Sequence, residues 1–383
     1  MNFLERANEL FDEMVECRRH IHRNAECGME LPLTVEYVSE KLRSYGYEPK
    51  PVAGGIVCTV GSGERTMLLR GDMDALPQTE VSGVPFACET GACHSCGHDM
   101  HTTMLLGAAK MLKECESELK GTIKLMFQPG EELLEGAKAM IKAGVLENPV
   151  VDCAMAIHCY PGDSCSIRYS HGRAMGASVF RILVHGKESH GARPYEGVSA
   201  AAVASEILLA GQRLVSNELQ EGNGDIVTFG IISSGSASNI VPGEAVLEGS
   251  IRSYENDNIA FLKRRLDEIA QNIAAANRAT AEVVYLREVR AFQNDRELVD
   301  QFAGCFEALT RKCVFLEGNT PGSEDFAEIG ALVPSMLVNI GVGSPEEGYI
   351  WGPHNPHRIF SEEALKTGAA CYAACAHHWA SGQ

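Results

Sequence analysis

The sequence lacks any apolar run approaching the roughly 18 residues that a membrane-spanning helix requires. Positive charge is also scarce, because 33 Lys and Arg stand against 51 Asp and Glu, for a formal net charge of −18. A nucleic-acid-binding surface needs clustered positive charge to neutralise phosphates. We therefore expect neither a membrane nor a nucleic acid as a partner.

A secretory signal is missing as well, because the first residues, MNFLERANELFDEM, mix acidic and apolar side chains where a signal has a basic start and an apolar stretch. The fourteen cysteines are scattered and do not form the even framework of a short disulfide-bonded chain. Scattered cysteines of this kind indicate reduced thiols. We expect a cytoplasmic protein.

The chain is long enough for more than one hydrophobic core, since its 383 residues exceed the ~250–300 at which a single core usually stops growing. After two predicted helices, short apolar runs alternate with helical patterns, and this alternation is typical of an α/β layer fold with a largely parallel sheet. The predicted helices are 2–23, 33–46, 101–114 and 133–144, and the predicted strands are 55–60, 67–70, 122–128 and 151–158.

A different pattern follows, in the order β-α-β-β-α-β, which is that of the ferredoxin-like unit. Its predicted strands are 177–186, 225–233, 244–253 and 280–287, and its helices are 196–215 and 256–276. The α/β pattern then resumes with a helix at 297–309, a strand at 334–340 and a helix at 361–379. The sequence therefore predicts an α/β domain of residues 1–173 and 291–383, with an inserted α+β domain at 174–290.

The segment from Cys93 to His101, CHSCGHDMH, holds two Cys, three His and an Asp within nine residues. Three interpretations compete for it. Cys93 and Cys96 have the spacing of a redox Cys-x-x-Cys, although such motifs do not need three histidines. A structural zinc site would need a second Cys/His pair nearby, and none follows closely. The interpretation that we favour is a catalytic metal site with further ligands far along the chain.

Acidic residues and histidines do occur at the ends of later predicted strands, where open α/β sheets place their sites. Each has a simpler explanation when taken alone, since Glu131 and Glu132 suit the first turn of a helix and a lone histidine is more often a half-buried structural residue. Their convergence favours the metal site. The residues are Asp72 and Asp74 after 67–70, Glu131 and Glu132 after 122–128, His158 at the end of 151–158, and His354 in a turn.

Six motifs occur in one order along the chain: RRHIHRNAECGME (18–30), RGDMDALP (70–77), HSCGHDMH (94–101), QPGEE (128–132), SHGARP (189–194) and NIVPGEA (239–245). With this set the sequence resembles the aminoacylase/carboxypeptidase family of dinuclear metallohydrolases. It is most similar to the amidohydrolase branch with hippurate hydrolase and indole-acetyl-amino-acid hydrolase. The resemblance spans about residues 15–375. It implies a zinc-exopeptidase-like catalytic domain and an inserted lid, or dimerisation, domain through which homodimers or higher homo-oligomers form.

The resemblance also implies a set of metal ligands for two divalent cations, with the Cys96 thiolate bridging them: Cys96, His98, Glu132, His158 and His354. Glu131 falls on the family's general base, and Asp74 would orient His98. Two cations activate a water molecule and stabilise the oxyanion, while a neighbouring carboxylate takes the proton of that water. A thiolate favours softer ions such as zinc, whereas members of the family are often assayed with manganese, cobalt or nickel. Zinc or manganese is therefore expected, with cobalt or nickel as further options. Cys93 lies outside the family motif and receives no role.

Three residues of the inserted domain are candidates for contacts with substrate. The resemblance matches His190 to a lid histidine that stabilises the oxyanion, in related dimers from the partner subunit. Asn239 and Arg252 are candidates for holding a substrate carboxylate, to which a guanidinium pairs in a bidentate way. The simpler interpretations are a solvated histidine in a polar turn and a surface arginine.

The sequence therefore predicts a metal-dependent amidohydrolase that cleaves a small N-acyl amino acid into a carboxylic acid and a free amino acid. Acetyl, benzoyl, indole-acetyl and longer acyl groups all suit this prediction. The alternatives are a dipeptidase or carboxypeptidase on the same fold, a thiol-redox or metal-storage protein, and a noncatalytic relative that binds metal.

Overall fold

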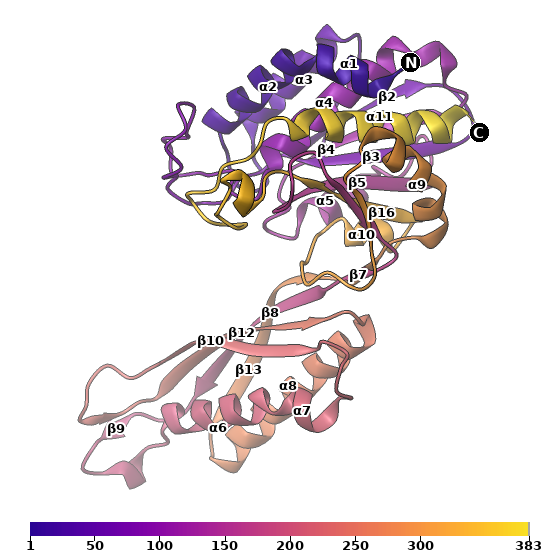
Figure 1. Cartoon of the computed structure of the whole chain (residues 1–383). Helices are drawn as coiled ribbons and strands as arrows, with labels where there is room; N and C mark the ends of the chain where they lie inside the picture. The colour runs from indigo at the N-terminus through magenta and orange to yellow at the C-terminus, as the bar shows by residue number, and fades with distance from the viewer. Residues whose placement is uncertain (382–383) are drawn as a thin grey trace. The chain divides into compact units, whose positions relative to one another are not determined.

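The computed structural model describes residues 1–381, and in it the chain divides into two units (Figure 1). Unit 1 comprises Met1–Gly172, Gln293–Gly318 and the chain from Asp325 onward. Unit 2 comprises Arg173–Phe292 and Asn319–Glu324. Unit 2 thus interrupts unit 1 in the sequence.

A mixed sheet of eight strands lies at the centre of unit 1, in the order β1-β2-β4-β3-β5-β16-β6-β15. Its four neighbours β4, β3, β5 and β16 are parallel, whereas β1 and β2 join it antiparallel. The carboxyl ends of these four strands therefore meet at one edge, which confirms the predicted α/β class. The strands are β1 (Lys50–Val52), β2 (Gly55–Gly61), β3 (Thr66–Asp72), β4 (Thr122–Gln128), β5 (Cys153–Tyr160), β6 (Ile167–Ser170), β15 (Cys313–Leu316) and β16 (Ser335–Gly341).

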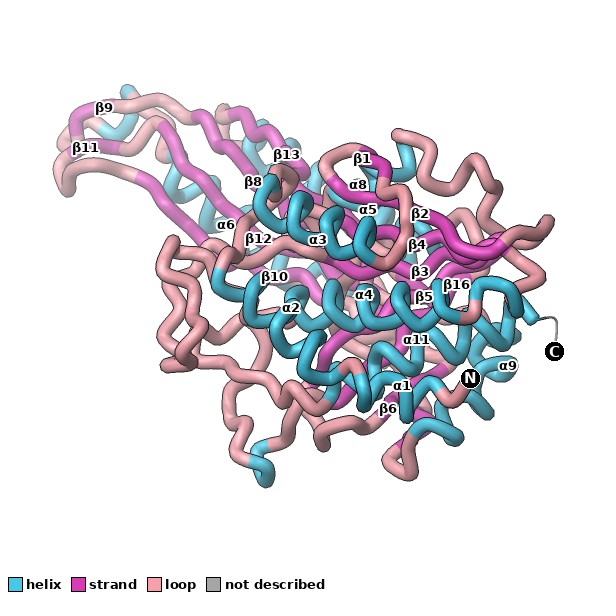
Figure 2. The backbone as a smooth tube through the Cα atoms, turned by 90° about the horizontal axis from the view of Figure 1, so that it is seen from above, coloured by secondary structure: helices cyan, strands magenta, loops and turns pink. Residues whose placement is uncertain are grey.

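Helices pack on this sheet, and Figure 2 shows α2, α4 and α11 side by side. Every residue of β3 and β4 is buried, as expected of strands covered on both faces. The helices of unit 1 are α1 (Phe3–Glu9), α2 (Phe11–Arg23), α3 (Pro32–Ser44), α4 (His98–Glu114), α5 (Gly136–Lys142), α9 (Arg296–Leu309), α10 (Ala327–Gly330) and α11 (Ala364–Ser381).

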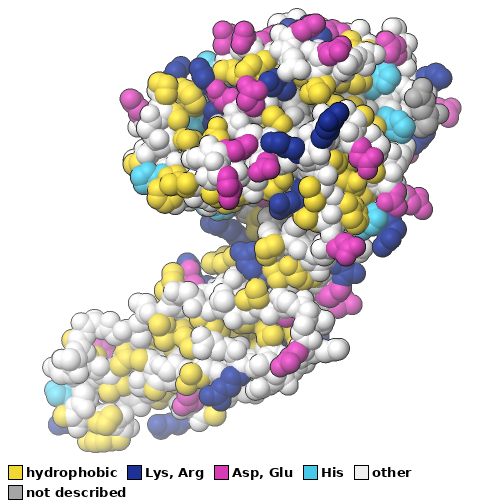
Figure 3. Space-filling model, in the orientation of Figure 1, with side chains coloured by type: hydrophobic (Ala, Val, Ile, Leu, Met, Phe, Trp, Pro, Cys, Tyr) yellow, Lys and Arg dark blue, Asp and Glu magenta, His cyan; other side chains and the backbone are white. Residues whose placement is uncertain are grey.

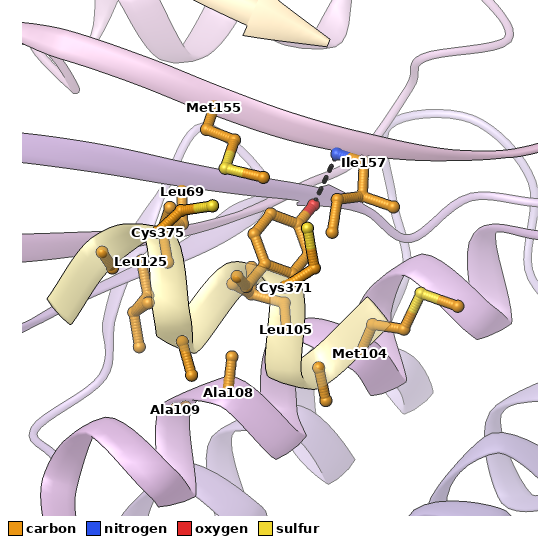
Figure 4. Packing of buried hydrophobic residues seen from close by; sticks show 14 of the residues in the cluster. Leu69, Met104, Leu105, Ala108, Ala109, Leu125, Met155, Ile157, Cys371 and Cys375 are labelled. Atoms are coloured by element: carbon orange, nitrogen blue, oxygen red, sulfur yellow. Dashed lines mark hydrogen bonds between the residues drawn. The ribbon is translucent and has the colours of Figure 1, made fainter. Parts of the chain in front are cut away.

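Tyr372 on α11 ties the helix layer to the sheet through its buried hydroxyl group. The hydroxyl donates to the carbonyl of Arg70 at 2.6 Å and accepts from the amide of Ile157 at 2.8 Å. Around it, Figure 4 shows Cys371 and Cys375 of α11 packed among apolar side chains of α4 and the sheet. The contacts hold β3 and β5 in position, and both strands lead into the candidate site.

Unit 2 contains a four-stranded antiparallel sheet in the order β10-β12-β8-β13. With the chain order β-α-β-β-α-β, this strand order confirms the predicted ferredoxin-like unit. Its elements are β7 (Arg173–Ala174), β8 (Gly176–His185), β9 (Ser189–His190), α6 (Ala200–Gln212), α7 (Leu214–Glu218), β10 (Ile226–Ser234), β11 (Ile240–Val241), β12 (Glu244–Ser253), α8 (Asn256–Ala276) and β13 (Thr280–Val289), followed by β14 (Phe292–Gln293) at the boundary.

Several predicted boundaries were wrong. The predicted helix 2–23 divides at Leu10, and 196–215 divides at Arg213. The predicted helix 133–144 is only Gly136–Lys142 long, because Leu134 adopts a left-handed φ of 59° in a turn that its amide closes on the carbonyl of Glu131. The strands β1, β6 and β15 were missed, since three or four residues carry too little periodicity to be recognised.

Among residues 1–381, no helix is both long enough and apolar enough to cross a membrane. The face drawn in Figure 3 shows Lys and Arg side chains interspersed with Asp and Glu side chains. All fourteen cysteines lie in the described part of the chain and are free thiols.

Candidate metal centre

A single glycine sets the geometry at the start of α4. Gly97 adopts a left-handed φ of 105°, and a Cβ there would lie 3.0 Å from the Phe360 ring and 3.2 Å from Cys159 Cβ. Glycine is the residue that tolerates both the backbone angle and the close approach. The turn places Cys96 and His98 on either side of Gly97, beside the carboxyl ends of β3, β4 and β5.

Hydrogen bonds fix which ring nitrogen His98 and His158 present to the candidate site. His98 Nδ1 lies 2.8 Å from the backbone carbonyl of Asp74, and His158 Nδ1 lies 2.8 Å from that of Cys159. A carbonyl only accepts, so Nδ1 carries a proton in both rings and Nε2 is the nitrogen left to face a metal. Such a bond to the far nitrogen is the usual arrangement around a metal-binding histidine.

The five predicted ligands come together as two groups that share Cys96. Ligand atoms of Cys96, His98 and His158 lie within 4.8 Å of one another, and so do those of Cys96, Glu132 and His354. His98 Nε2 and Glu132 Oε1 are buried and have no hydrogen-bond partner within the described chain. A buried polar atom without a partner is costly, and a cation would supply the missing interaction. The donor set therefore fits two divalent metal ions.

Burial and neighbouring charges shift the pKa values of these ligands in the metal-free protein. Burial raises the pKa of the Cys96 thiol to about 11 and also raises the pKa of Glu132. Burial lowers the pKa of His158, whereas Asp72, Cys96 and Asp74 together outweigh burial and raise the pKa of His98. A metal binds the thiolate, the carboxylate and the neutral imidazole, so loading this site would release protons.

Glu131 and Asp74 adjoin the ligands. Glu131 is 6% exposed, and its Oε2 lies 3.8 Å from His98 Nε2. The Asp74 carboxylate accepts from the backbone amides of Glu131 and Glu132 at 3.0 and 3.1 Å. Asp74 thus holds the Glu131–Glu132 turn with its side chain and meets His98 through its main-chain carbonyl. The roles of Glu131 as base and Asp74 as orienter stay predictions.

Sequence reasoning missed a second buried cluster directly beside the ligands. His101 Nδ1 donates to Asp72 Oδ1 at 2.6 Å, and its Nε2 accepts from the amide of Cys159 at 2.8 Å. Arg70, which is fully buried, donates to Asp72 at 2.6 Å and to Asp325 at 2.8 Å. Both ring nitrogens of His101 therefore have hydrogen-bond partners, so His101 is not available as a metal ligand. The sequence signal for this cluster was the third histidine of the HSCGHDMH motif.

A third group of buried charged residues connects α2 to α4. His22 Nδ1 lies 2.9 Å from Asp99 Oδ2, and its Nε2 lies 3.0 Å from Glu80 Oε1. Burial lowers the pKa of His22, but the hydrogen bonds to the two carboxylates outweigh it and raise the pKa to about 9. Arg18 donates to Asp99 at 2.8 Å. The RRHIHRN motif thus anchors the segment that follows His98.

Cys93 lies apart from the ligands. It pairs by a backbone bridge with Leu76, and burial raises the pKa of its thiol to about 12. A redox dithiol depends on a lowered thiol pKa and on access. The environment of Cys93 therefore argues against the Cys-x-x-Cys redox interpretation.

The candidate residues of the inserted unit lie together only in part. His190 and Ile240 are paired between β9 and β11, which places exposed Asn239 beside exposed His190. Arg252 on β12 is half-buried and donates to Ser323 Oγ at 3.0 Å. The substrate contacts assigned to His190, Asn239 and Arg252 stay predictions.

Comparison with known proteins identifies relatives over almost the full length of the chain. The IAA-amino acid hydrolase ILR1-like 4 of Arabidopsis thaliana is 35% identical over 393 residues, covering 97% of this chain and 87% of that protein. The N-acetylcysteine deacetylase of Bacillus subtilis is 30% identical over 369 residues, covering 94% of this chain and 95% of that protein.

Solved structures give the same result for the fold. A putative aminohydrolase from methicillin-resistant Staphylococcus aureus superposes with a TM-score of 0.90 at 27% identity, covering 99% of this chain and 100% of that chain. A dinuclear metal-binding peptidase from Bacillus subtilis superposes with a TM-score of 0.82 at 25% identity, covering 97% and 99%. The family model for peptidase family M20/M25/M40 matches residues 68–378. The chain belongs to peptidase family M20/M25/M40.

Proposed function

We propose that the protein is a metal-dependent amidohydrolase that cleaves a small N-acyl amino acid into a carboxylic acid and a free amino acid. The observation that carries this proposal is the sharing of Cys96 by two ligand groups, with the Glu131 carboxylate beside them. Relatives named for the hydrolysis of indole-acetyl amino acids and of N-acetylcysteine support the substrate class.

The chain's own side chains divide the work in this proposal. Cys96, His98, Glu132, His158 and His354 hold two divalent cations, which when bound supply Lewis-acid stabilisation of the oxyanion. Glu131 takes the proton of the attacking water and returns it to the leaving amine nitrogen, as a general base and then a general acid. Asp74 keeps Glu131 and Glu132 aligned through their backbone amides.

For the metal we propose zinc or manganese, and zinc is the better match to a ligand set of one thiolate, three imidazoles and a single carboxylate. Cobalt and nickel suit the same donors. Fourteen free thiols favour a reducing compartment such as the cytoplasm. We further propose that the inserted unit serves as lid and dimerisation domain, with His190 reaching the oxyanion and Asn239 and Arg252 reaching the substrate carboxylate.

A panel of N-acyl amino acids, assayed after chelation and again after metal is restored, tests the proposal. Hydrolysis should vanish on chelation and return with zinc or manganese. Free amino acid and carboxylic acid should appear in equal amounts. Full activity in the metal-free protein would contradict the proposal.

A carboxypeptidase or dipeptidase is the second candidate, because the thermostable carboxypeptidase 2 of Saccharolobus solfataricus is 32% identical over 378 residues. A dipeptide differs from an N-acyl amino acid in carrying a free amine, which needs an acidic partner in the site. Matched pairs of substrates, one with an N-acetylated and one with a free amine, separate the two. A higher kcat/KM for the free amine would favour the peptidase.

A further inference from the structure

Asp325 is a fully buried acid of unit 1 whose side chain is held by three different elements. Its carboxylate accepts from Arg70 Nη2 on β3 at 2.8 Å and from Gln128 Nε2 at the end of β4 at 2.8 Å. It also accepts from the backbone amide of Ala137 in the first turn of α5 at 2.9 Å. These bonds fix residue 325 beside the carboxyl ends of β3 and β4, where the candidate metal centre lies.

The backbone amide of the same residue contacts the predicted base. It donates to Glu131 Oε1 in a long hydrogen bond of 3.4 Å, while Glu131 Oε2 lies 3.8 Å from Nε2 of the predicted ligand His98. The main chain of Glu131 is held separately, since its amide donates to the Asp74 carboxylate at 3.0 Å. Glu131 is thus held at its backbone by Asp74 and at one carboxylate oxygen by Asp325, with the second oxygen beside a metal ligand.

We propose that Asp325 is a positioning residue: the bonds to its carboxylate fix its amide, and the amide sets the orientation of the Glu131 carboxylate. This inference rests on the proposed role of Glu131 as general base. A general base must lie within hydrogen-bond reach of the proton that it takes. A displacement of about 1 Å in this geometry costs roughly 100-fold in rate.

The hydrogen-bond pattern explains why position 325 needs a carboxylate. Oδ1 accepts from Arg70 and Gln128, and Oδ2 accepts from Gln128 and Ala137, so both oxygens face N–H donors. Gln128 presents its Nε2 here because its Oε1 accepts from Arg70 Nε at 2.9 Å. An asparagine carries an NH₂ group in place of one oxygen, and in either orientation that group would point at a donor. Asp325→Asn, although equal in size, should therefore displace the side chain together with its amide.

The kinetic test is a double-mutant cycle on the hydrolysis of an N-acyl amino acid, with Asp325→Asn and Glu131→Gln measured singly and together. We expect Asp325→Asn alone to lower kcat by about 10–100-fold and to change KM by less than about threefold, with both metal ions retained. In the Glu131→Gln background it should change the residual kcat by less than about twofold, because the group that it positions is already lost. Equal losses in both backgrounds would overturn the proposal, as would a normal kcat in Asp325→Asn.

Asp295→Ala is the matched control for a general loss of stability. The Asp295 carboxylate accepts from the amide of Leu298 in the first turn of α9 at 2.9 Å, as that of Asp325 does from Ala137 in α5. The amide of Asp295 donates to the carbonyl of Ser335 at the amino end of β16, so this residue lies at the opposite edge of the sheet from the candidate metal centre. Asp295→Ala should lower the urea midpoint and leave kcat at the wild-type value. A loss of kcat equal to that of Asp325→Asn would overturn the positioning role.

Crystal structures of wild type and Asp325→Asn, prepared in the same metal-loaded state, give a readout that does not depend on activity. In the variant the Glu131 carboxylate should turn away from the amide of residue 325, and an unchanged orientation would overturn the proposal. The same comparison separates this inference from the proposed function. A wild type that hydrolyses no N-acyl amino acid would remove the role of Glu131 as base, whereas the orientation of its carboxylate would still be decided by the two structures.

If Asp325→Asn does not fold, Gln128→Met takes its place in both tests. This substitution removes the Gln128 donor from both oxygens of Asp325 and leaves the bond from Arg70. It should lower kcat less than Asp325→Asn would, but with the same dependence on the Glu131 background. A loss of kcat that is independent of Glu131 would overturn the proposal here too.

Discussion

Two buried clusters of histidine and carboxylate lie side by side in unit 1, and they differ in whether their polar atoms have partners. In the ligand cluster, His98 Nε2 and Glu132 Oε1 have no hydrogen-bond partner among residues 1–381. In the paired cluster, formed by Arg70, Asp72 and His101, each ring nitrogen of His101 is bonded and Asp72 is held by Arg70. The same residue types thus form a candidate metal site in the ligand cluster and a fully hydrogen-bonded histidine in the paired cluster.

The difference shows that residue type and burial do not identify a ligand, and that the hydrogen-bond partners of each buried polar atom have to be considered as well. Asp72, His98 and His101 also lie within 4.8 Å of one another, so distance alone would make them a metal site. Burial raises the pKa of Asp72, but Arg70, His98 and His101 together outweigh it and hold that pKa well below its usual range. Asp72 is therefore a charged partner of Arg70 and His101, and it is not needed as a ligand.

The largest effect is expected from Cys96→Ala, which removes the residue shared by both ligand groups. Metal content should fall from about two ions per chain to well below one, and hydrolysis should be lost with it. Inductively coupled plasma mass spectrometry gives the metal count. Cys93→Ala is the matched control, and it should retain both ions because the Cys93 thiol belongs to none of the candidate ligand groups. Equal metal loss in both variants would contradict the assignment.

Glu131→Gln should separate chemistry from metal binding. We expect kcat to fall by roughly 10²–10⁴-fold, the usual contribution of a general base, while two ions per chain are retained. Glu132→Gln should instead lose metal. The measurement is steady-state hydrolysis beside metal content, and a near-normal rate in Glu131→Gln would show that the base lies elsewhere.

Asp72→Asn should break the paired cluster without removing a ligand. Arg70 would lose one of its buried carboxylate partners, and removing one member of a buried ion pair costs about 3–5 kcal/mol. Urea unfolding measures the free energy of unfolding. Asp300→Asn is the control, since Asp300 is 62% exposed in its pair with His171 and should change the free energy by about 1 kcal/mol or less. Similar losses in both variants would mean that the paired cluster contributes no special stability.

The smallest effect concerns pH and the His22 group. Because the folded pKa of His22 is raised to about 9, above the ordinary value near 6.5, its stabilisation is fully present below pH 6.5. It is lost as the pH rises through 9, and the stabilisation amounts to roughly 3 kcal/mol. The difference in unfolding free energy between wild type and His22→Gln should therefore shrink between pH 6.5 and 9.5. A difference that stayed constant over this range would show that His22 is neutral in the folded protein.

The sequence by itself determined the class of fold and the types of side chain at the site. Alternating helical and apolar patterns placed β3, β4 and β5 correctly to within a few residues, and carboxyl ends of parallel strands share an edge. The strand pattern thus favoured a metal site near Glu132 and His158. The selection of Cys96, and its grouping with His354 some 260 residues later, was what the family resemblance implied.

The resemblance named His98 as a ligand, and only the tertiary structure gives the physical reason why His98 and not His101 has a nitrogen left for a metal. His98 and His101 lie three residues apart on α4 and are both fully buried. The carbonyl of Asp74 bonds Nδ1 of His98 and leaves its Nε2 open to a cation, whereas Asp72 and the amide of Cys159 occupy both nitrogens of His101. These partners come from other strands, and a histidine's free lone pair is set by its hydrogen bonds, which the local sequence does not contain.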